Sequence, residues 1–420
     1  MDLNWENRLS RMANNRIHGS IFSDLGAIEK KYKPVCLSIG EPATDFFPLE
    51  DMRVFFNAIC DRRDLFGYYP YHAGFTALRE WIVTWMHNDG IVPSWVTSQN
   101  IVLTNGSQQA LSYISDLLVD EETCVAVEAP SYVEALRTFR RAGAKFVEIE
   151  TDENGIIPES FENVCKEFNP SILYTIPNFQ NPSGSVAPID RRNTILDIAN
   201  KYDVVIIEDD PYRYVSFVDS LPQTYIGLAN ENKRVIYLGS FSKLIAPGIR
   251  CGWMVLPSPI VGKMLELRNT IEMSLPAPMQ FVVSEFCLNI NIHSYLLKIQ
   301  NYYKKRCNYL ISSLDKYMVP SGLKINYPTG GLFVWSQMPG IKDDVDFVKY
   351  AIKNYGVSVM PGSIFYSKPG QGMDTLRFSF ARIDEETAEE GCRRLALAYD
   401  NYIMDSEKIK NEERRSVIYE

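Results

Sequence analysis

Residues 235–257 read VIYLGSFSKLIAPGIRCGWMVLP, and this stretch decides how the rest of the chain is interpreted. Two short apolar runs, VIYLGSFS and GWMVLP, enclose a loop that carries one lysine, Lys243, and one arginine, Arg250. Apolar runs of this length are typical of buried central strands. A lysine beside such a strand is costly unless its charge is paired or its amine is used covalently. The loop is therefore the first candidate for a functional site.

Five similar runs precede this stretch and are separated mostly by amphipathic segments such as SQQALSYISDLLV and RRNTILDIANKY. The alternation of strand and helix predicts an α/β fold with a mainly parallel, seven-stranded sheet covered by helices. The five runs are IVLT from residue 101, CVAVEAP from 124, KFVEIE from 145, SILYTIP from 171 and VVIIEDDP from 204.

The pattern changes after GWMVLP. A long helical region from about residue 275 to 318 is followed by two short strands, GGLFVWSQM and LRFSFA, with the helix DVDFVKYAIKNY between them. This mixture predicts a smaller α+β domain, and the N-terminal segment is expected to pack with it. The expected division is residues 1–45 for that segment, 46–300 for a large cofactor-binding domain and 301–420 for the small domain.

Composition excludes several classes of function. The 420 residues carry a formal net charge of -9, which disfavours general binding to nucleic acids or anionic membranes. The eight cysteines form no CxxC pair, so we expect reduced thiols rather than a metal site or disulfides, and a cytoplasmic location. Neither a signal peptide nor an apolar run long enough to span a membrane is evident.

Polar motifs follow the expected strands at the edge where a doubly wound sheet binds ligands. Gly106, Ser107 and Gln108 open a helix, whose free N–H groups suit a phosphate. Asp209 lies in EDDPY and Asn181 in the turn NPSG. Each motif alone has an ordinary explanation as a helix cap or a turn. Together with the lysine, however, they describe a ligand with a phosphate, a cationic ring nitrogen and an aldehyde, which is pyridoxal 5'-phosphate.

The motifs NPSG, EDDPY, SFSKLIAPGIRCGW and LRFSFA follow one another in this order, and the resemblance that they carry covers roughly residues 15–402. In this combination the chain resembles the class I/II aminotransferases of the aspartate aminotransferase fold family, and it is most similar to the aminoadipate and kynurenine aminotransferase branch. The resemblance implies a pyridoxal-phosphate-dependent transferase that moves an amino group from an L-amino acid to a 2-keto acid through an imine on Lys243.

The same resemblance implies individual roles for the residues. Lys243 forms the imine and later moves the proton, while Asp209 pairs with the pyridinium nitrogen and is preferred over Asp210. Asn181 and Tyr212 hydrogen-bond the phenolic oxygen. Besides these residues, the ones implied to bind the cofactor are Tyr132, which stacks on the ring, and Gly106, Ser107, Gln108, Ser240, Ser242 and Arg250 around the phosphate.

Substrate and subunit contacts are implied as well. Arg377, in LRFSF, grips the α-carboxylate, and Gly40 and Asn181 line the substrate pocket. Tyr69 is expected to act in catalysis by reaching the phosphate of a partner subunit, which implies a homodimer with shared sites. Phe22 stands where several relatives carry an arginine, which argues against a dicarboxylate substrate.

Two alternatives stay open at this point. The same cofactor residues serve enzymes that carry out β- or γ-elimination, replacement or cyclisation on an amino acid, so the sequence favours the cofactor more firmly than the reaction. A DNA-binding regulator built on the same fold is disfavoured, because only about 40 residues precede the IGEP turn and none read as a basic recognition-helix pair. The role of His72, next to the expected partner loop, is left undecided.

Overall fold

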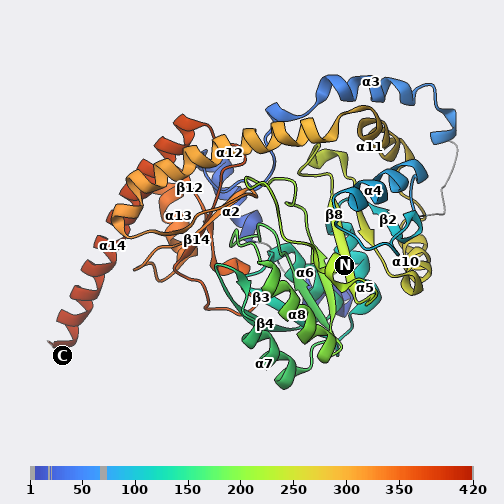
Figure 1. Cartoon of the computed structure of the whole chain (residues 1–420). Coiled ribbons are helices and arrows are strands. Elements are labelled where there is room, and N and C mark those ends of the chain that lie inside the picture. Colours follow the sequence, from blue (N-terminus) through green and yellow to red (C-terminus); the bar gives the residue numbers. More distant parts are fainter. Residues whose placement is uncertain (1–4, 18, 20, 67–72, 419–420) are drawn as a thin grey trace.

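The computed structural model describes residues 5–17, 19, 21–66 and 73–418. Its centre is a large sheet wrapped by helices, and a smaller sheet lies beside it under the C-terminal helices (Figure 1). The described part of the large sheet has eight strands, one more than the seven that the sequence indicated. Their spatial order is β2 (Ile101–Thr104), β9 (Gly252–Val255), β8 (Val235–Ser240), β7 (Val205–Asp209), β6 (Ile172–Thr175), β3 (Cys124–Ala129), β4 (Lys145–Asp152) and β5 (Gly155–Ile156).

The seven predicted runs are all strands of this sheet. The central ones, β3, β4, β6, β7 and β8, run parallel, which confirms the mainly parallel α/β architecture. Strand β9 lies antiparallel between β8 and β2. The additional strand β5 consists of two residues that turn back on the end of β4. Because β5 has only two residues, it contains no apolar run from which the sequence could predict a strand.

Helices cover the large sheet because its strands are apolar on both faces; every residue of β2, β6, β8 and β9 is buried. Helix α5 packs on β2, β8 and β9, and α6 packs against α5. The helices of this part are α3 (Leu49–Ile59), α4 (Thr76–Asn88), α5 (Ser107–Leu118), α6 (Val133–Ala142), α7 (Pro158–Phe168), α8 (Ile189–Lys201), α9 (Tyr225–Ala229), α10 (Ser258–Ile271) and α11 (Ala277–Asn289).

The smaller part joins the two ends of the chain. Strand β1 (Val35–Cys36) pairs in parallel with β12 (Val357–Ser358), and α2 (Ile21–Tyr32) packs on α13 (Asp344–Tyr355). These contacts confirm that the N-terminal segment packs with the C-terminal third. The main sheet of the smaller part has the strand order β10 (Lys324–Asn326), β11 (Phe333–Gln337), β14 (Thr375–Ser379) and β13 (Met360–Pro361).

Two long helices frame the smaller part. Helix α12 (Ile292–Tyr317) runs from the large part into it, and α14 (Glu385–Ile418) projects beyond the body at the C-terminal end (Figure 1). The domain division expected from the sequence stays a prediction, and residue 300 falls within α12. A short helix, α1 (Arg11–Arg16), begins the described N-terminal segment. No helix in the described ranges has both the length and the apolar character needed to cross a bilayer.

Candidate active site

A cavity of about 160 Å³ opens at the carboxyl ends of β6, β7 and β8, where the sequence placed its polar motifs. Of the expected cofactor-binding residues, Gly106 alone is not among those that line it, and it immediately precedes Ser107. Residues from the first and last thirds of the large part therefore meet at one edge of the sheet. The lining residues are Ser107, Gln108, Tyr132, Ile176, Asn181, Asp209, Pro211, Tyr212, Ser240, Ser242, Lys243, Pro247 and Arg250.

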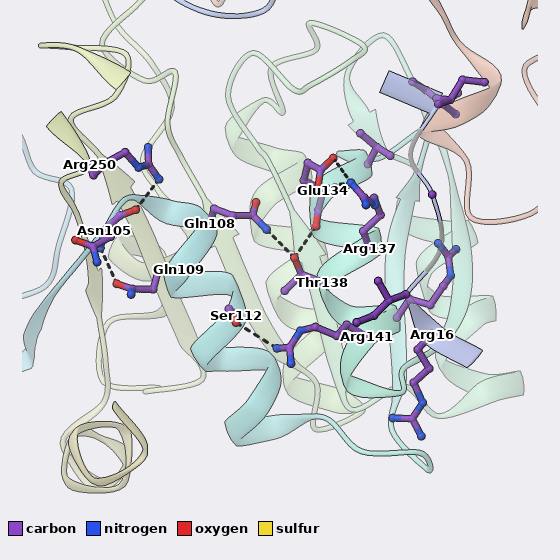
Figure 2. Close-up of a pocket in the computed structure, with 16 residues that line it drawn as sticks. Arg16, Asn105, Gln108, Gln109, Ser112, Glu134, Arg137, Thr138, Arg141 and Arg250 are labelled. Atoms are coloured by element: carbon purple, nitrogen blue, oxygen red, sulfur yellow. Dashed lines mark hydrogen bonds and ion pairs between the residues drawn. The ribbon is translucent and has the colours of Figure 1, made fainter. Parts of the chain in front are cut away.

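One end of this cavity is built to receive an anion. Ser107 begins α5, and Gly106 precedes it with φ of 84°, a conformation that favours glycine. A Cβ at position 106 would lie 2.8 Å from the Arg250 guanidinium, so glycine leaves the space that this side chain occupies. The guanidinium donates to the Asn105 carbonyl oxygen at 2.6 Å (Figure 2). It also donates to the Pro247 carbonyl oxygen at 3.1 Å. The helix N-terminus and the guanidinium together suit a phosphate.

A second cavity, of about 720 Å³, adjoins the first and shares Gln108 and Arg250 with it. Figure 2 shows it between α5 and α6, with Gln108 directed toward Thr138, to which its amide donates at 2.7 Å. Five guanidinium groups line this cavity, and those of Arg16, Arg137 and Arg141 are paired with carboxylates. The remaining two, those of Arg140 and Arg250, donate to backbone carbonyl oxygens instead.

Asp209 also lines the cavity of about 160 Å³, which is called the cofactor cavity below. Its Oδ2 accepts a hydrogen bond of 2.9 Å from the Tyr174 hydroxyl, while its buried Oδ1 has no partner among the described residues. Burial raises the pKa of Asp209 to about 7, the Tyr174 hydrogen bond lowers it, and the neighbouring Asp210 raises it. A buried carboxylate oxygen with no partner at a cavity wall fits a protonated ring nitrogen, which would supply both a donor and an opposite charge.

Asp210 is directed elsewhere, although it is the next residue. Its carboxylate accepts from Asn178 at 2.9 Å and from the Tyr237 hydroxyl at 3.3 Å, and it lies 3.6 Å from the Arg213 guanidinium. Asp210 does not line the cofactor cavity. Of the two acids, only Asp209 lines this cavity, and its role toward a cofactor stays a prediction.

Lys243 lies between the cofactor cavity and the substrate side. Its amine donates to the Gly40 carbonyl oxygen at 3.2 Å and lies 5.9 Å from the centre of the Tyr212 ring. Burial lowers the pKa of the amine to about 8, while the charge of Glu41 opposes this shift. A substantial fraction of neutral amine near physiological pH is what a nucleophile that attacks an aldehyde needs.

Two phenols and one amide line the same cavity as the lysine. Burial raises the pKa of Tyr132 and of Tyr212, so both stay protonated donors at neutral pH. Tyr212 meets the Phe333 ring edge-on, with centroids 5.8 Å apart. The side-chain oxygen of Asn181 accepts a hydrogen bond of 3.0 Å from Arg377. The amide thus joins the cofactor cavity to the group expected to bind substrate.

Arg377, on β14, is a buried cation whose described polar contacts include no carboxylate. It donates to Asn181 and, at 3.2 Å, to the Ser38 carbonyl oxygen, and its buried Nε has no partner among the described residues. The guanidinium lies over the Phe333 ring at 4.1 Å. Burial lowers its pKa to about 10, so it remains charged at neutral pH. Such a group attracts an incoming carboxylate, because a buried charge without a counter-ion is costly.

Lys243 and Arg377 both line a third cavity, of about 470 Å³, which is called the substrate cavity below. Gly40 lies here in close contact: a Cβ at this position would lie 2.9 Å from the Phe333 ring. Tyr69 and His72 lie outside the described residues. The lining residues are Phe22, Leu25, Gly26, Glu29, Ser38, Ile39, Gly40, Glu41, Tyr132, Val133, Glu134, Asn181, Tyr212, Lys243, Phe333, Met360, Arg377 and Arg382.

The comparison with protein families decides the identity of this arrangement. The family described as "Aminotransferase class I and II" matches residues 32–395. The chain belongs to the class I and II aminotransferases. These enzymes use pyridoxal phosphate, so the protein is a pyridoxal-phosphate-dependent transferase, and the alternative of elimination, replacement or cyclisation is not favoured.

Two named relatives and two solved structures resemble the aminotransferase over almost its full length. It is 30% identical to the 2-aminoadipate transaminase of Thermus thermophilus over 94% of this chain and 97% of that protein. It is 32% identical to aromatic-amino-acid aminotransferase 1 of Thermococcus litoralis, over 86% and 87%. The structure of Pyrococcus horikoshii kynurenine aminotransferase matches with a TM-score of 0.89, 31% identity and coverage of 95% and 98%. The α-aminoadipate aminotransferase LysN of Thermus thermophilus matches with a TM-score of 0.86, 29% identity and coverage of 95% and 99%.

Several side chains of the site escaped the sequence analysis of the aminotransferase. Tyr174 reads as one more apolar strand residue, although its hydroxyl reaches Asp209. Glu41 and Arg382 form an ion pair of 2.7 Å at the substrate cavity, 341 residues apart. The sequence offered one clue to Glu41: it directly follows Gly40, which was expected to line the substrate pocket.

Proposed function

We propose that this aminotransferase takes the amino group from L-amino acids whose side chains are neutral and apolar or aromatic. The observation that carries the proposal is the pairing of the two arginines described in the lining of the substrate cavity. Arg382 forms an ion pair with Glu41, whereas the described hydrogen bonds of Arg377 go to Asn181 and Ser38 and to no carboxylate. One such cation suits one carboxylate, the α-carboxylate common to all amino acids. The rest of the cavity then selects the side chain.

The carboxylates that line the substrate cavity already have partners. Glu41 pairs with Arg382 at 2.7 Å, and Glu134 pairs with Arg137 at 2.9 Å. A further carboxylate, that of Glu29, accepts hydrogen bonds from neighbouring hydroxyl groups. A second substrate carboxylate would meet these acids without a free guanidinium among the described residues of the cavity.

The other surface of the cavity is apolar. Phe22 and Leu25 come from α2, Ile39 from the following turn, and Phe333 and Met360 from the small sheet. Burying an apolar substrate side chain against such a wall contributes roughly 25 cal/mol per Å² of area removed from water. This term favours leucine-like or aromatic side chains over polar ones.

The test compares kcat/KM for phenylalanine, leucine, aspartate and 2-aminoadipate with one keto acid. We expect the two apolar substrates to exceed the two dicarboxylates by roughly 100-fold, the usual consequence of leaving a charge unpaired in a binding site. Phe22→Arg should raise the relative rate with 2-aminoadipate, because it adds a cation to the cavity. Phe168→Arg, at the exposed end of α7, makes the same change away from the site and should leave the ratio unchanged. A wild-type preference for dicarboxylates would overturn the proposal.

We assign the roles within the cofactor site as follows. Pyridoxal phosphate supplies an electron sink that stabilises negative charge on the substrate α-carbon. Asp209 holds the ring nitrogen in its protonated state, and Asn181 and Tyr212 orient the ring oxygen. Lys243 holds the cofactor and moves the proton, while Arg377 fixes the substrate carboxylate. Tyr132 would stack on the ring, and the residues that would hold the phosphate are Gly106, Ser107, Gln108, Ser240, Ser242 and Arg250.

We further propose a homodimer in which Tyr69 of one chain completes the site of the other. Supporting this, α3 leaves Leu49, Val54 and Phe56 exposed to 64, 64 and 44%, an apolar surface that a second copy would cover. We also propose a cytoplasmic location, for which the eight unpaired cysteines argue.

A further inference from the structure

Tyr174 is a buried tyrosine that neither the sequence nor the proposed roles account for. It lies on β6, fully shielded from solvent, and its ring packs against Phe139 with centroids 5.7 Å apart. Its hydroxyl donates to Asp209 Oδ2 across the β6–β7 pair at 2.9 Å. Since Asp209 is 1% exposed, its carboxylate depends mainly on protein groups for its hydrogen bonds.

The hydrogen bond makes the two oxygens of the Asp209 carboxylate different, because only one of them receives it. Oδ2 is fixed by the strand neighbour, and Oδ1, which has no partner among the described residues, is left for the cofactor. A hydrogen bond to a carboxylate favours its ionised form. The other nearby groups act in the opposite direction, because burial and the charge of Asp210 both favour the neutral acid. Tyr174 thus opposes the two influences that would protonate Asp209.

We propose that Tyr174 is a positioning residue that holds Asp209 ionised and directs its free oxygen at the ring nitrogen of pyridoxal phosphate. The inference rests on the proposed role of Asp209. Without the hydroxyl, the carboxylate becomes the stronger base of the pair, and the proton that the two groups share moves from the ring nitrogen to Asp209. The total charge of the pair stays the same, but the ring becomes a weaker electron sink.

The decisive measurement is the protonation state of the ring nitrogen itself. The protein is reconstituted with pyridoxal phosphate labelled with ¹⁵N in the ring, and the resonance is recorded by solid-state NMR at one fixed pH near neutrality. For Tyr174→Phe we expect the resonance to move toward that of the unprotonated ring. We also expect kcat to fall by about 10- to 100-fold, the range for one hydrogen bond to a charged group, with KM changed by less than about twofold.

The chain offers a matched control in Tyr237. It is also buried, lies on the neighbouring strand β8, and donates to the adjacent carboxylate, Asp210 Oδ2, at 3.3 Å. Tyr237→Phe therefore removes the same atom from an equivalent place and should leave the ring resonance unchanged. If Tyr174→Phe does not fold, as judged by the thermal midpoint of the cofactor-free protein, Tyr174→Met removes the hydroxyl with a side chain that adapts to the space.

The outcomes separate this inference from the assignment on which it rests. Asp209→Asn must move the ring resonance if Asp209 is the partner of the nitrogen. A shifted resonance in Asp209→Asn together with a wild-type resonance in Tyr174→Phe would overturn the role of Tyr174 alone. A wild-type resonance in Asp209→Asn would overturn both. Equal shifts in Tyr174→Phe and Tyr237→Phe would show a general effect of lost buried hydroxyls and would also reject the specific role.

Discussion

Asp209 and Asp210 are consecutive in the chain, yet their carboxylates serve different surroundings. Asp209 lines the cofactor cavity and leaves one oxygen without a partner among the described residues. Asp210 is enclosed by Asn178, Tyr237 and Arg213. The peptide between them lies at the end of β7, where alternation along the strand sends neighbouring side chains to opposite faces. We therefore expect Asp209 to serve catalysis and Asp210 to serve the stability of the fold.

The first prediction separates these two acids. Asp209→Asn should reduce kcat by several orders of magnitude with little change in stability, because the ring nitrogen loses its counter-charge. Asp210→Asn should lower the free energy of unfolding by about 3 kcal/mol, since it leaves the buried Arg213 guanidinium unpaired, and should retain most of the activity per folded molecule. Steady-state kinetics and chemical denaturation of both variants test this. The reverse order of effects would mean that the carboxylates had been assigned to the wrong roles.

The second prediction concerns the amine of Lys243. Borohydride reduction should attach the cofactor to this lysine, and Lys243→Ala should bind cofactor without turnover. Since burial lowers the pKa of the amine to about 8 from its ordinary value of 10.5, the rate of imine formation by the cofactor-free protein should rise with pH and level off above about 8. Glu41→Gln removes a charge that raises this pKa, so its midpoint should lie lower. A midpoint at the ordinary value, or an adduct on another lysine, would contradict the assignment.

A third prediction addresses the grip on the substrate. Arg377→Lys keeps the charge and loses the two-pronged geometry, so kcat/KM should fall by the equivalent of about 2 to 3 kcal/mol, mostly through KM. The comparison variant is Arg382→Lys, whose guanidinium is paired with Glu41 and should matter less for the α-carboxylate. Presteady-state binding of a substrate analogue separates affinity from chemistry. Equal losses in the two variants would argue against a specific role for Arg377.

The fourth prediction tests the shared site. Tyr69→Phe and Arg250→Ala should each reduce activity, and a mixture of the two inactive proteins should recover activity after subunit exchange. Recovery is expected because one of the two sites in a hybrid dimer then draws both groups from unaltered chains. Sedimentation at the working concentration measures the oligomer. A monomer, or a mixture no more active than its components, would rule out Tyr69 as a residue contributed by a partner.

The sequence predicted seven of the eight described strands of the large sheet and the edge where the site is expected, because both depend on local patterns. The lysine loop, the NPSG turn and the EDDPY turn each follow a strand whose apolar run is visible, so their meeting place follows from the parallel sheet. What could not be predicted depends on register. Tyr174 reaches Asp209 only because β6 pairs with β7 so that Thr175 faces Glu208, and nothing in either run specifies that offset.

The substrate side was harder for a second reason. Arg377 and Asn181 meet across 196 residues, and Arg382 and Glu41 across 341. Family resemblance brought Arg377 and Asn181 to notice, but the pairing of Glu41 with Arg382 arises because the two ends of the chain fold together in the smaller part. Composition and periodicity carry no record of such a contact. The choice of substrate is therefore the part of the function that sequence patterns define least.

The pairing of β1 with β12 brings a segment that precedes the large sheet to the substrate cavity. The residues before the large sheet supply one side of the substrate cavity, from Phe22 to Glu41, whereas the described residues of the cofactor cavity all come later. Part of the selectivity is thus encoded in a block of the gene that contains none of the described residues of the cofactor cavity. Changes in this block can alter which amino acid is accepted without shifting any strand that carries the catalytic groups. Such a layout lets a lineage diversify its substrates while its reaction stays fixed.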